Sequence, residues 1–271
     1  MLPTNNLEPI CYALEDVDGT LTDSKGKFHG AVIAEGIQRI SLKPKELITS
    51  EIAQAAYNGP GHGVDYFELL YNNLFVPYFE SPIEALRAFR KKLPEVAREL
   101  KNASFFEDEI KPLPGALESL QMLEARGIEV AAVTMTPGYL AEAILHIAGL
   151  LQQKTPQRRY VKRIYGCELY SPEESLDPKL DRYFKGFRDA VKGLKKQDPE
   201  LWKRTLGYTF DDLNLSRCMV AEDGSQGIQG AATLGVGLLV VLKQSNLLDT
   251  QISPQTTLLT AKEDGNWNTL Q

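Results

Sequence analysis

The chain has 271 residues, of which 43% are hydrophobic and 24% are charged. This balance is typical of a globular protein and excludes a disordered chain, a collagen-like repeat and a coiled coil that spans the whole sequence. The formal net charge of −6 argues against a broad nucleic-acid surface, which requires clustered positive charge, although it permits a small basic pocket.

The first predicted element is a buried strand. The apolar run Ile10–Leu14 is short and ends in the polar, glycine-bearing stretch Glu15–Thr20. Such a run is typical of a parallel strand that is covered on both faces and continues into a loop.

The next segment, from Ser24 to Lys111, is predicted to be a helical insertion. It contains several helical patterns in succession and no convincing buried strand. We predict separate helices over Ser81–Lys92 and Leu93–Leu100. The glycine-rich stretch Gly59–Gly63 interrupts these patterns and is predicted to be a loop.

Three further buried strands are predicted over Ile128–Val133, Arg217–Ala221 and Val236–Leu242. Helical patterns bracket them, one after Pro114-Gly115 and one before Gly149. Because strands and helices alternate, we predict right-handed crossovers and a parallel sheet. The predicted fold class is α/β, with a Rossmann-like core that carries the helical insertion.

The remaining stretches are polar or basic. Residues 152–198 are strongly basic, and the chain turns polar after Lys243. We expect the tail over residues 244–271 to be extended or only partly packed.

Cysteine content and hydropathy indicate the compartment. Cys11, Cys167 and Cys218 are widely spaced and form no CxxC pair, so neither a disulfide framework nor a cysteine zinc site is expected. No stretch approaches the roughly 20 apolar residues that span a bilayer, and Met1–Glu15 has no basic residue ahead of its apolar run. We therefore expect a cytoplasmic protein without a membrane partner.

Polar side chains follow three of the predicted strands. In an open α/β sheet, functional groups gather beyond the carboxyl ends of the strands. We therefore expect these side chains to share one edge of the sheet, with Lys179 as a basic complement. The residues at the three strand ends are Asp16 and Asp18, Thr134 and Thr136, and Glu222 and Asp223.

Asp16 and Asp18 also have two simpler interpretations. A calcium loop that starts at Asp16 would need an acid or amide at Thr20 and a glycine at Leu21, so this alternative fails. A solvated acidic turn is the default for the pair alone. It becomes weaker because a second acidic pair ends another strand.

The residues themselves resemble a known family. The stretch Leu14–Ser24 is similar to the first motif of the haloacid dehalogenase-like hydrolases, in which Asp-x-Asp-Gly-Thr-Leu follows the first strand. Val130–Thr134 resembles the second motif, a strand that ends in Thr or Ser. Val220–Ile228 resembles the acidic fourth motif. The order and spacing of the motifs also agree.

This resemblance covers nearly the whole chain and points to the subgroup of phosphoglycolate phosphatases and β-phosphoglucomutases. It implies that residues 24–111 are a helical cap domain. Residues 1–23 and 112–271 would then form the α/β core.

The resemblance also implies a mechanism. Asp16 would be the nucleophile that becomes an aspartyl phosphate, and Asp18 the general acid and then the general base. Thr134 and Lys179 would hold the oxygens of the transferring group. A carboxylate attacks a phosphoryl dianion only when the repulsion is screened, and Mg²⁺ with hard oxygen ligands does this. The implied metal residues are Asp16, Asp18 through its carbonyl, Glu222 and Asp223.

The chain departs from the family pattern at several positions. Glu15 stands where the family usually has an apolar residue, and we expect the strand to turn it away from the metal, towards a basic partner. Lys179 is not followed by the frequent proline of the third motif, so Lys185 is the alternative. Gly224 replaces a frequent serine in the fourth motif. The presence of Asp18 disfavours the dehalogenase branch, which does not use that acid.

Other residues are assigned to the substrate or to the scaffold. Gly19, Thr20 and His62 are the predicted substrate-binding residues, and a plain surface role is the alternative for His62. Thr136 is interpreted as a helix cap and His29 as structural. Six aromatic residues are interpreted as the core of the cap: Tyr66, Phe67, Tyr71, Phe75, Tyr78 and Phe79.

The predicted function is a magnesium-dependent phosphatase that hydrolyses a small phosphorylated metabolite through an aspartyl phosphate. A phosphomutase of the β-phosphoglucomutase kind uses the same residues and differs in needing a sugar bisphosphate primer. A weakly catalytic domain that binds a ligand or a partner protein is the third alternative. We expect no nucleic-acid or membrane partner, and either a monomer or a homodimer.

Overall fold

The computed structural model describes most of the chain, and within the described part no helix is long and apolar enough to cross a membrane. The described residues are 9–24, 27–59, 66–101, 106, 109–151, 160–169, 186–187, 189–210, 214–247 and 250–271.

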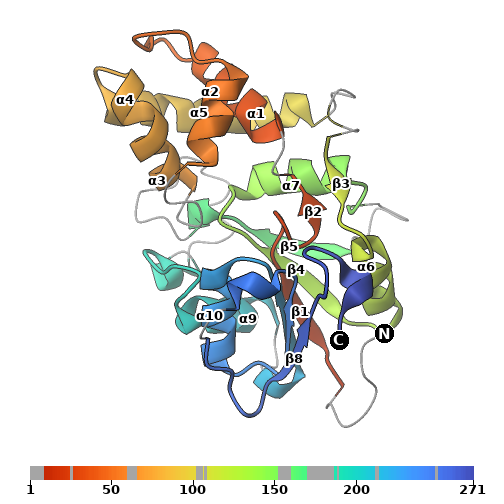
Figure 1. The fold of residues 1–271 in the computed structure, drawn as a ribbon. Helices are drawn as coiled ribbons and strands as arrows, with labels where there is room; N and C mark the ends of the chain where they lie inside the picture. Colours follow the sequence, from red (N-terminus) through yellow and green to blue (C-terminus); the bar gives the residue numbers. More distant parts are fainter. Residues whose placement is uncertain are drawn as a thin grey trace.

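The centre of the molecule is a six-stranded sheet with the order β5-β4-β1-β6-β7-β8, in which every neighbouring pair is parallel (Figure 1). Its inner strands are buried on both faces, which is why they read as continuous apolar runs in the sequence. The prediction of an α/β fold with a parallel sheet is confirmed. The strands are β1 (Tyr12–Glu15), β4 (Glu129–Val133), β5 (Val161–Tyr165), β6 (Cys218–Glu222), β7 (Leu238–Val241) and β8 (Thr257–Thr260).

Helices connect these strands in the order that the alternating pattern predicts. Figure 1 shows α9 and α10 side by side on one face of the sheet, with α6 on the other. Helix α9 begins after Asp198, whose side chain caps the helix by accepting a hydrogen bond from the Glu200 amide. The helices are α6 (Ala116–Ala125), α7 (Gly138–Ile147), α9 (Pro199–Thr209) and α10 (Ser225–Leu234).

A helical segment, α1 to α5, lies beyond the carboxyl end of the sheet (Figure 1). The chain enters it through β2 (Thr22–Asp23) and leaves it through β3 (Lys111–Pro112), and these two strands pair antiparallel. The two connections to the core therefore lie side by side. The elements between them are α1 (Lys27–Gln38), α2 (Ser50–Tyr57), α3 (Tyr66–Leu70), the π-helix η1 (Tyr71–Phe75), α4 (Val76–Tyr78) and α5 (Pro82–Leu100).

The prediction of two helices over residues 81–100 is wrong, because α5 runs through Pro94 without ending. Proline in a helix interior removes one hydrogen bond and costs about 3 kcal/mol or more. The apolar stripe continues on both sides of it, since Phe89, Leu93 and Val96 are fully buried. Burial of a continuous stripe therefore outweighs the local cost.

The tail was expected to be extended or only partly packed, and the described part over residues 250–271 is partly extended and packs on the core at a few positions. Strand β8 extends the sheet by pairing with β7, and Trp267 is only 6% exposed. The Trp267 indole donates a hydrogen bond to the Thr20 carbonyl at 2.8 Å, and its backbone amide donates to the Pro114 carbonyl at 2.9 Å. The tail thus covers an open strand edge and braces the loop that follows β1.

Candidate active site

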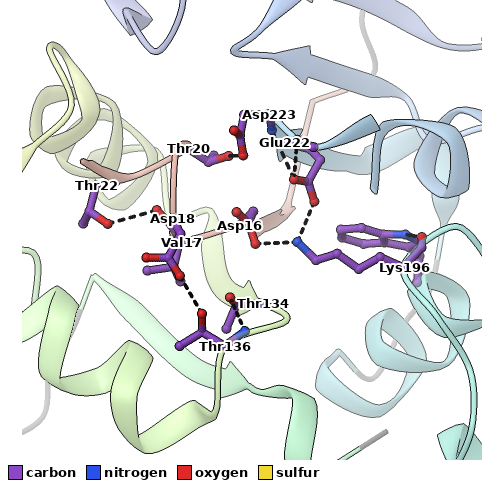
Figure 2. A network of polar contacts seen from close by, with 12 residues as sticks. Asp16, Val17, Asp18, Thr20, Thr22, Thr134, Thr136, Lys196, Glu222 and Asp223 are labelled. Carbon is purple, nitrogen blue, oxygen red and sulfur yellow. Dashed lines mark hydrogen bonds and ion pairs between the residues drawn. The ribbon is translucent and has the colours of Figure 1, made fainter. Parts of the chain in front are cut away.

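The loop after β1 directs its two aspartates to different places. The Asp16 amide still donates to the Ala221 carbonyl of the neighbouring strand at 3.0 Å, so Asp16 continues the sheet register. The chain then turns sharply at Gly19, which has a φ of 93° and therefore needs a residue without a Cβ. Figure 2 shows Asp16 facing Lys196, whereas Asp18 points towards Thr136.

Lys196 is the positive centre of the site. Its side chain is only 5% exposed, and its ammonium donates hydrogen bonds to Asp16 Oδ1 and, at 2.7 Å, to Glu222 Oε2 (Figure 2). The other oxygen of Glu222 accepts from the backbone amides of Asp223 at 3.1 Å and Gly224 at 2.9 Å. The Glu222 carboxylate is therefore fixed from three directions, and it fixes the ammonium.

The first turn of α10 leaves room for this carboxylate. A Cβ atom on Gly227 would lie 2.0 Å from Glu222 Oε2, which no real contact allows. A glycine at this position is thus a steric requirement of the ion pair. This clash explains why a glycine stands at this distance after the acidic pair Glu222 and Asp223 in the sequence.

Negative charge exceeds positive charge at this point. Oxygens of Asp16, Glu222 and Asp223 lie within 4.8 Å of one another, and Lys196 is the ammonium that contacts two of them. Burial raises the pKa of Asp16, as does the charge of Glu222, while Lys196 opposes the shift. Burial likewise raises the pKa of Glu222. This donor set of crowded carboxylate oxygens fits a hard divalent cation such as Mg²⁺.

Asp18 lies in a different environment. The Thr136 hydroxyl donates to Asp18 Oδ2 at 2.7 Å, the Ser24 hydroxyl donates to Oδ1, and His29 Nε2 lies 3.6 Å from Oδ1. Burial alone would raise the pKa of Asp18. The contact with His29, together with the two hydroxyl hydrogen bonds, outweighs burial and lowers this pKa to about 2. Two neighbouring aspartates therefore have opposite pKa shifts.

Two interpretations of the sequence change here. Thr136 is not the cap of α7, because Pro137 occupies the N-cap position and the Thr136 hydroxyl bonds Asp18 instead. His29 has a contact with Asp18 beyond its structural role, although it is fully buried and stacks on Tyr57 at 4.1 Å. The side chains reach Asp18 from α1 and from the loop after β4.

The structure brings Thr134 and Thr20 to the same edge. Thr134 is 1% exposed, and its hydroxyl oxygen accepts from the Thr136 amide at 3.1 Å. The Thr20 hydroxyl lies 3.4 Å from Asp223 Oδ1 (Figure 2). The prediction that these strand ends meet at one edge is thus confirmed, with Gly19 supplying the turn.

Sequence reasoning missed Lys196. Lys179, Lys185 and His62 lie outside the described residues, so their predicted roles stay predictions. A local signal for Lys196 exists, since Asp198-Pro199 is a typical N-cap and first-turn pair that begins a helix. A lysine just before such a start lies at the entrance to the helix that precedes β6.

Glu15 departs from its expected environment. Neither carboxyl oxygen has a hydrogen-bond partner in the described part of the chain, so the expected basic partner is not found there. Glu15 is fully buried, and this burial raises its pKa to about 8. The side chain is therefore protonated at neutral pH.

A cavity of about 320 Å³ opens onto the acidic cluster. The sheet edge lines it with Asp16, Asp18 and Lys196 among others. The described residues of the helical segment that line it are Tyr57, Tyr66 and Leu69. The cavity thus lies between the strand ends and the helices.

The family model of the haloacid dehalogenase-like hydrolases matches residues 13–235 of this chain. No curated protein matches this sequence. Among solved structures, CbbY from Rhodobacter sphaeroides in complex with phosphate has a TM-score of 0.58 at 16% identity, covering 96% of this chain and 99% of that chain.

Two further solved structures have the same fold. A protein from Clostridium difficile, assigned provisionally as a phosphatase, has a TM-score of 0.53 at 18% identity over 93% of this chain and 94% of that chain. One from Thermotoga maritima, assigned provisionally as a β-phosphoglucomutase, has a TM-score of 0.50 at 16% identity with the same coverage. The match to the family description spans well over half of the sequence, and the chain therefore belongs to the haloacid dehalogenase-like hydrolases.

Proposed function

We propose that the protein is a magnesium-dependent phosphatase that hydrolyses a small phosphorylated metabolite through an aspartyl phosphate on Asp16. One observation carries the proposal. Asp16 pairs with a buried ammonium in a cavity, while Asp18 is held by its own set of donors. A nucleophile beside a cation, with a separate proton-handling group, is the arrangement that covalent phosphoryl transfer needs.

In the first step, a carboxylate oxygen of Asp16 forms a bond to phosphorus while the bond from phosphorus to the alcohol oxygen breaks. Asp18 gives its proton to that oxygen. The pKa of Asp18 is about 2 without substrate, and an approaching phosphate dianion raises it, because like charge favours the neutral carboxyl. Substrate binding would therefore favour the protonated form of Asp18, which can then act as the general acid.

In the second step, Asp18 takes a proton from a water molecule, whose oxygen attacks phosphorus. The bond from phosphorus to Asp16 breaks, and inorganic phosphate leaves. Lys196 and Thr134 would hold the phosphoryl oxygens in both steps, because charge that develops on them needs fixed donors. We assign to Lys196 the role that the sequence suggested for Lys179.

Mg²⁺ fits the acidic cluster, where it would screen the repulsion between Asp16 and the phosphoryl group. Asp16, Asp223 and the Asp18 carbonyl would be its protein ligands. Glu222 belongs to the same cluster, but its oxygens already accept from Lys196 and two backbone amides. Its contribution would be to fix Lys196.

The helical segment would act as a cap domain over residues 24–111, with the core at 1–23 and 112–271. The adjacent strands β2 and β3 support this division, since a paired entry and exit can act as a hinge. Closure over the cavity would exclude bulk water from the aspartyl phosphate.

Phosphate release from a panel of phosphate monoesters, with Mg²⁺ and with a chelator, tests the proposal. We expect release that needs Mg²⁺ and is lost in Asp16→Asn. A phosphomutase remains the second candidate, because the protein from Thermotoga maritima assigned as a β-phosphoglucomutase has the same fold. Turnover that depends on a sugar bisphosphate primer, without net phosphate release, would favour the mutase.

A further inference from the structure

Tyr66, the first residue of α3, is a buried polar residue in the wall of the cavity. It is 2% exposed and lines the cavity, and its hydroxyl has no hydrogen-bond partner in the described part of the protein. Tyr57 also lines the cavity, but its hydroxyl bonds Thr136. The two tyrosines therefore differ in whether the hydroxyl has a hydrogen-bond partner among the described residues.

The ring of Tyr66 is fixed by its neighbours. It packs against the rings of Tyr57 at 5.7 Å, His29 at 6.0 Å and Phe67 at 5.4 Å. The side chain thus has little freedom to turn its hydroxyl towards another partner. A buried hydroxyl without a hydrogen bond is unfavourable, so the group is expected to find its partner in a bound molecule.

The position of the hydroxyl shows which part of a substrate it would meet. Burial raises the pKa of Tyr66, and the nearby charges of Cys167 and Asp18 add to the shift. Its ring packs against His29 at 6.0 Å, and His29 Nε2 lies 3.6 Å from Asp18 Oδ1. Tyr66 therefore lies on the side of the cavity that holds Asp18, the group proposed to protonate the leaving alcohol. The Tyr66 hydroxyl would therefore meet the leaving alcohol of the substrate and not its phosphoryl group.

The chemistry of this wall favours a neutral partner. Tyr57, Tyr66 and Leu69 carry no charge, and they are the described residues through which the helical segment lines the cavity. A phenol can donate to or accept from an alcohol oxygen. The described residues of the helical segment that line the cavity include no lysine or arginine, so a second anionic group here would meet the negative charge of Asp18.

We propose that Tyr66 is a specificity-determining residue whose hydroxyl hydrogen-bonds a second hydroxyl group on the leaving alcohol. The substrate class is then a phosphate monoester of a polyhydroxylated alcohol. This inference rests on the proposed phosphatase function.

The test compares two esters of equal carbon number, glycerol 3-phosphate and n-propyl phosphate. The measured quantity is the ratio of their kcat/KM values in the wild type, in Tyr66→Phe and in the control Tyr57→Phe. We expect the wild type to prefer glycerol 3-phosphate and Tyr66→Phe to lower the ratio about fivefold to tenfold, the worth of one hydrogen bond. Tyr57→Phe acts through Thr136 on proton transfer, so it should change both esters alike and leave the ratio unchanged.

Thermal unfolding supplies a second readout. Tyr66→Phe removes a hydroxyl that has no partner among the described residues, so its unfolding midpoint should equal or exceed that of the wild type. A lower midpoint would mean that the hydroxyl serves the fold, and an unchanged ratio with both esters hydrolysed would overturn the inference alone. If the wild type releases phosphate from no ester, the proposed function falls, and the inference with it.

Discussion

The two walls of the cavity are made of different chemistry. The sheet edge supplies carboxylates and lysines, whereas the described part of the helical segment supplies two tyrosines and a leucine. Charged side chains gather where the carboxyl ends of parallel strands meet, because each strand delivers its next residues to the same line. In the proposed function, the sheet edge would bind the charged phosphoryl group and the helices would recognise the alcohol.

The largest effect is expected at the centre of the charged wall. Asp16→Asn should lower phosphate release at least about 10⁴-fold, because an amide cannot form the acyl phosphate. The variant should fold, since Asn keeps the shape of the side chain and Lys196 keeps its contact with Glu222. Circular dichroism checks the fold, and turnover similar to the wild type would contradict the mechanism.

Glu15 contrasts with the carboxyls of the charged wall. Asp16 and Glu222 contact Lys196, whereas the Glu15 carboxyl has no hydrogen-bond partner among the described residues. The folded-state pKa of Glu15 is about 8, against an ordinary value of 4.5. Between these two pH values the folded protein therefore binds one more proton than the unfolded chain does. The contribution of Glu15 to the free energy of unfolding should therefore fall as pH rises through this window, by about 5 kcal/mol at about 1.4 kcal/mol per pKa unit.

Urea unfolding of the wild type, Glu15→Gln and Glu15→Leu at several pH values between about 5 and 8 measures this effect. Both variants should lose the slope that Glu15 causes. Glu15→Leu should be the more stable of the two, because leucine buries no polar group. Equal slopes in all three proteins would mean that Glu15 finds a partner after all.

The role of Lys196 can be separated from that of its neighbours. Lys196→Met should lower kcat about 10²- to 10³-fold, because one fixed donor to the transferring oxygens is lost. Lys195→Met, at the exposed neighbouring position, is the matched control and should have little effect. Lys179→Met is informative too: a loss there, with normal activity in Lys196→Met, would return the third motif to Lys179.

The acidic cluster predicts a metal dependence. Asp223→Asn should raise the Mg²⁺ concentration for half-maximal activity at least about tenfold, because one charged ligand of the cluster becomes neutral. Calorimetric titration with Mg²⁺ should show the same weakening without substrate. Unchanged Mg²⁺ affinity in this variant would remove Asp223 from the ligands.

The smallest effect is expected where the two walls touch. His29→Phe keeps the stacking on Tyr57 but removes the contact that lowers the pKa of Asp18. The pKa of Asp18 should rise towards its ordinary range, so the decline of kcat/KM with rising pH, which marks the loss of the Asp18 proton, should move to higher pH. A decline at unchanged pH would show that the hydroxyls of Ser24 and Thr136 suffice.

Local sequence pattern was enough to predict four strands of the sheet and the acids of the site. Buried parallel strands appear as short apolar runs, so β1, β4, β6 and β7 were predictable from local pattern. Their carboxyl ends share one edge, which made the meeting of Asp16 with Glu222 and Asp223 predictable as well. Strand β8 and Trp267 were not predictable, because a polar tail acquires its structure from the open edge of β7 and from the Thr20 carbonyl.

Tertiary structure decided which partners complete these groups. Lys196 is 180 positions from Asp16 along the chain, and Thr136 is 118 positions from Asp18. No periodicity of 2 or 3.6 residues encodes such a contact, since it depends on how a loop crosses the strand ends. The lack of a partner for Glu15 and Tyr66 among the described residues has the same origin. Whether a buried polar atom finds a partner is determined by the packing of distant elements, and the local sequence specifies only that the atom is there.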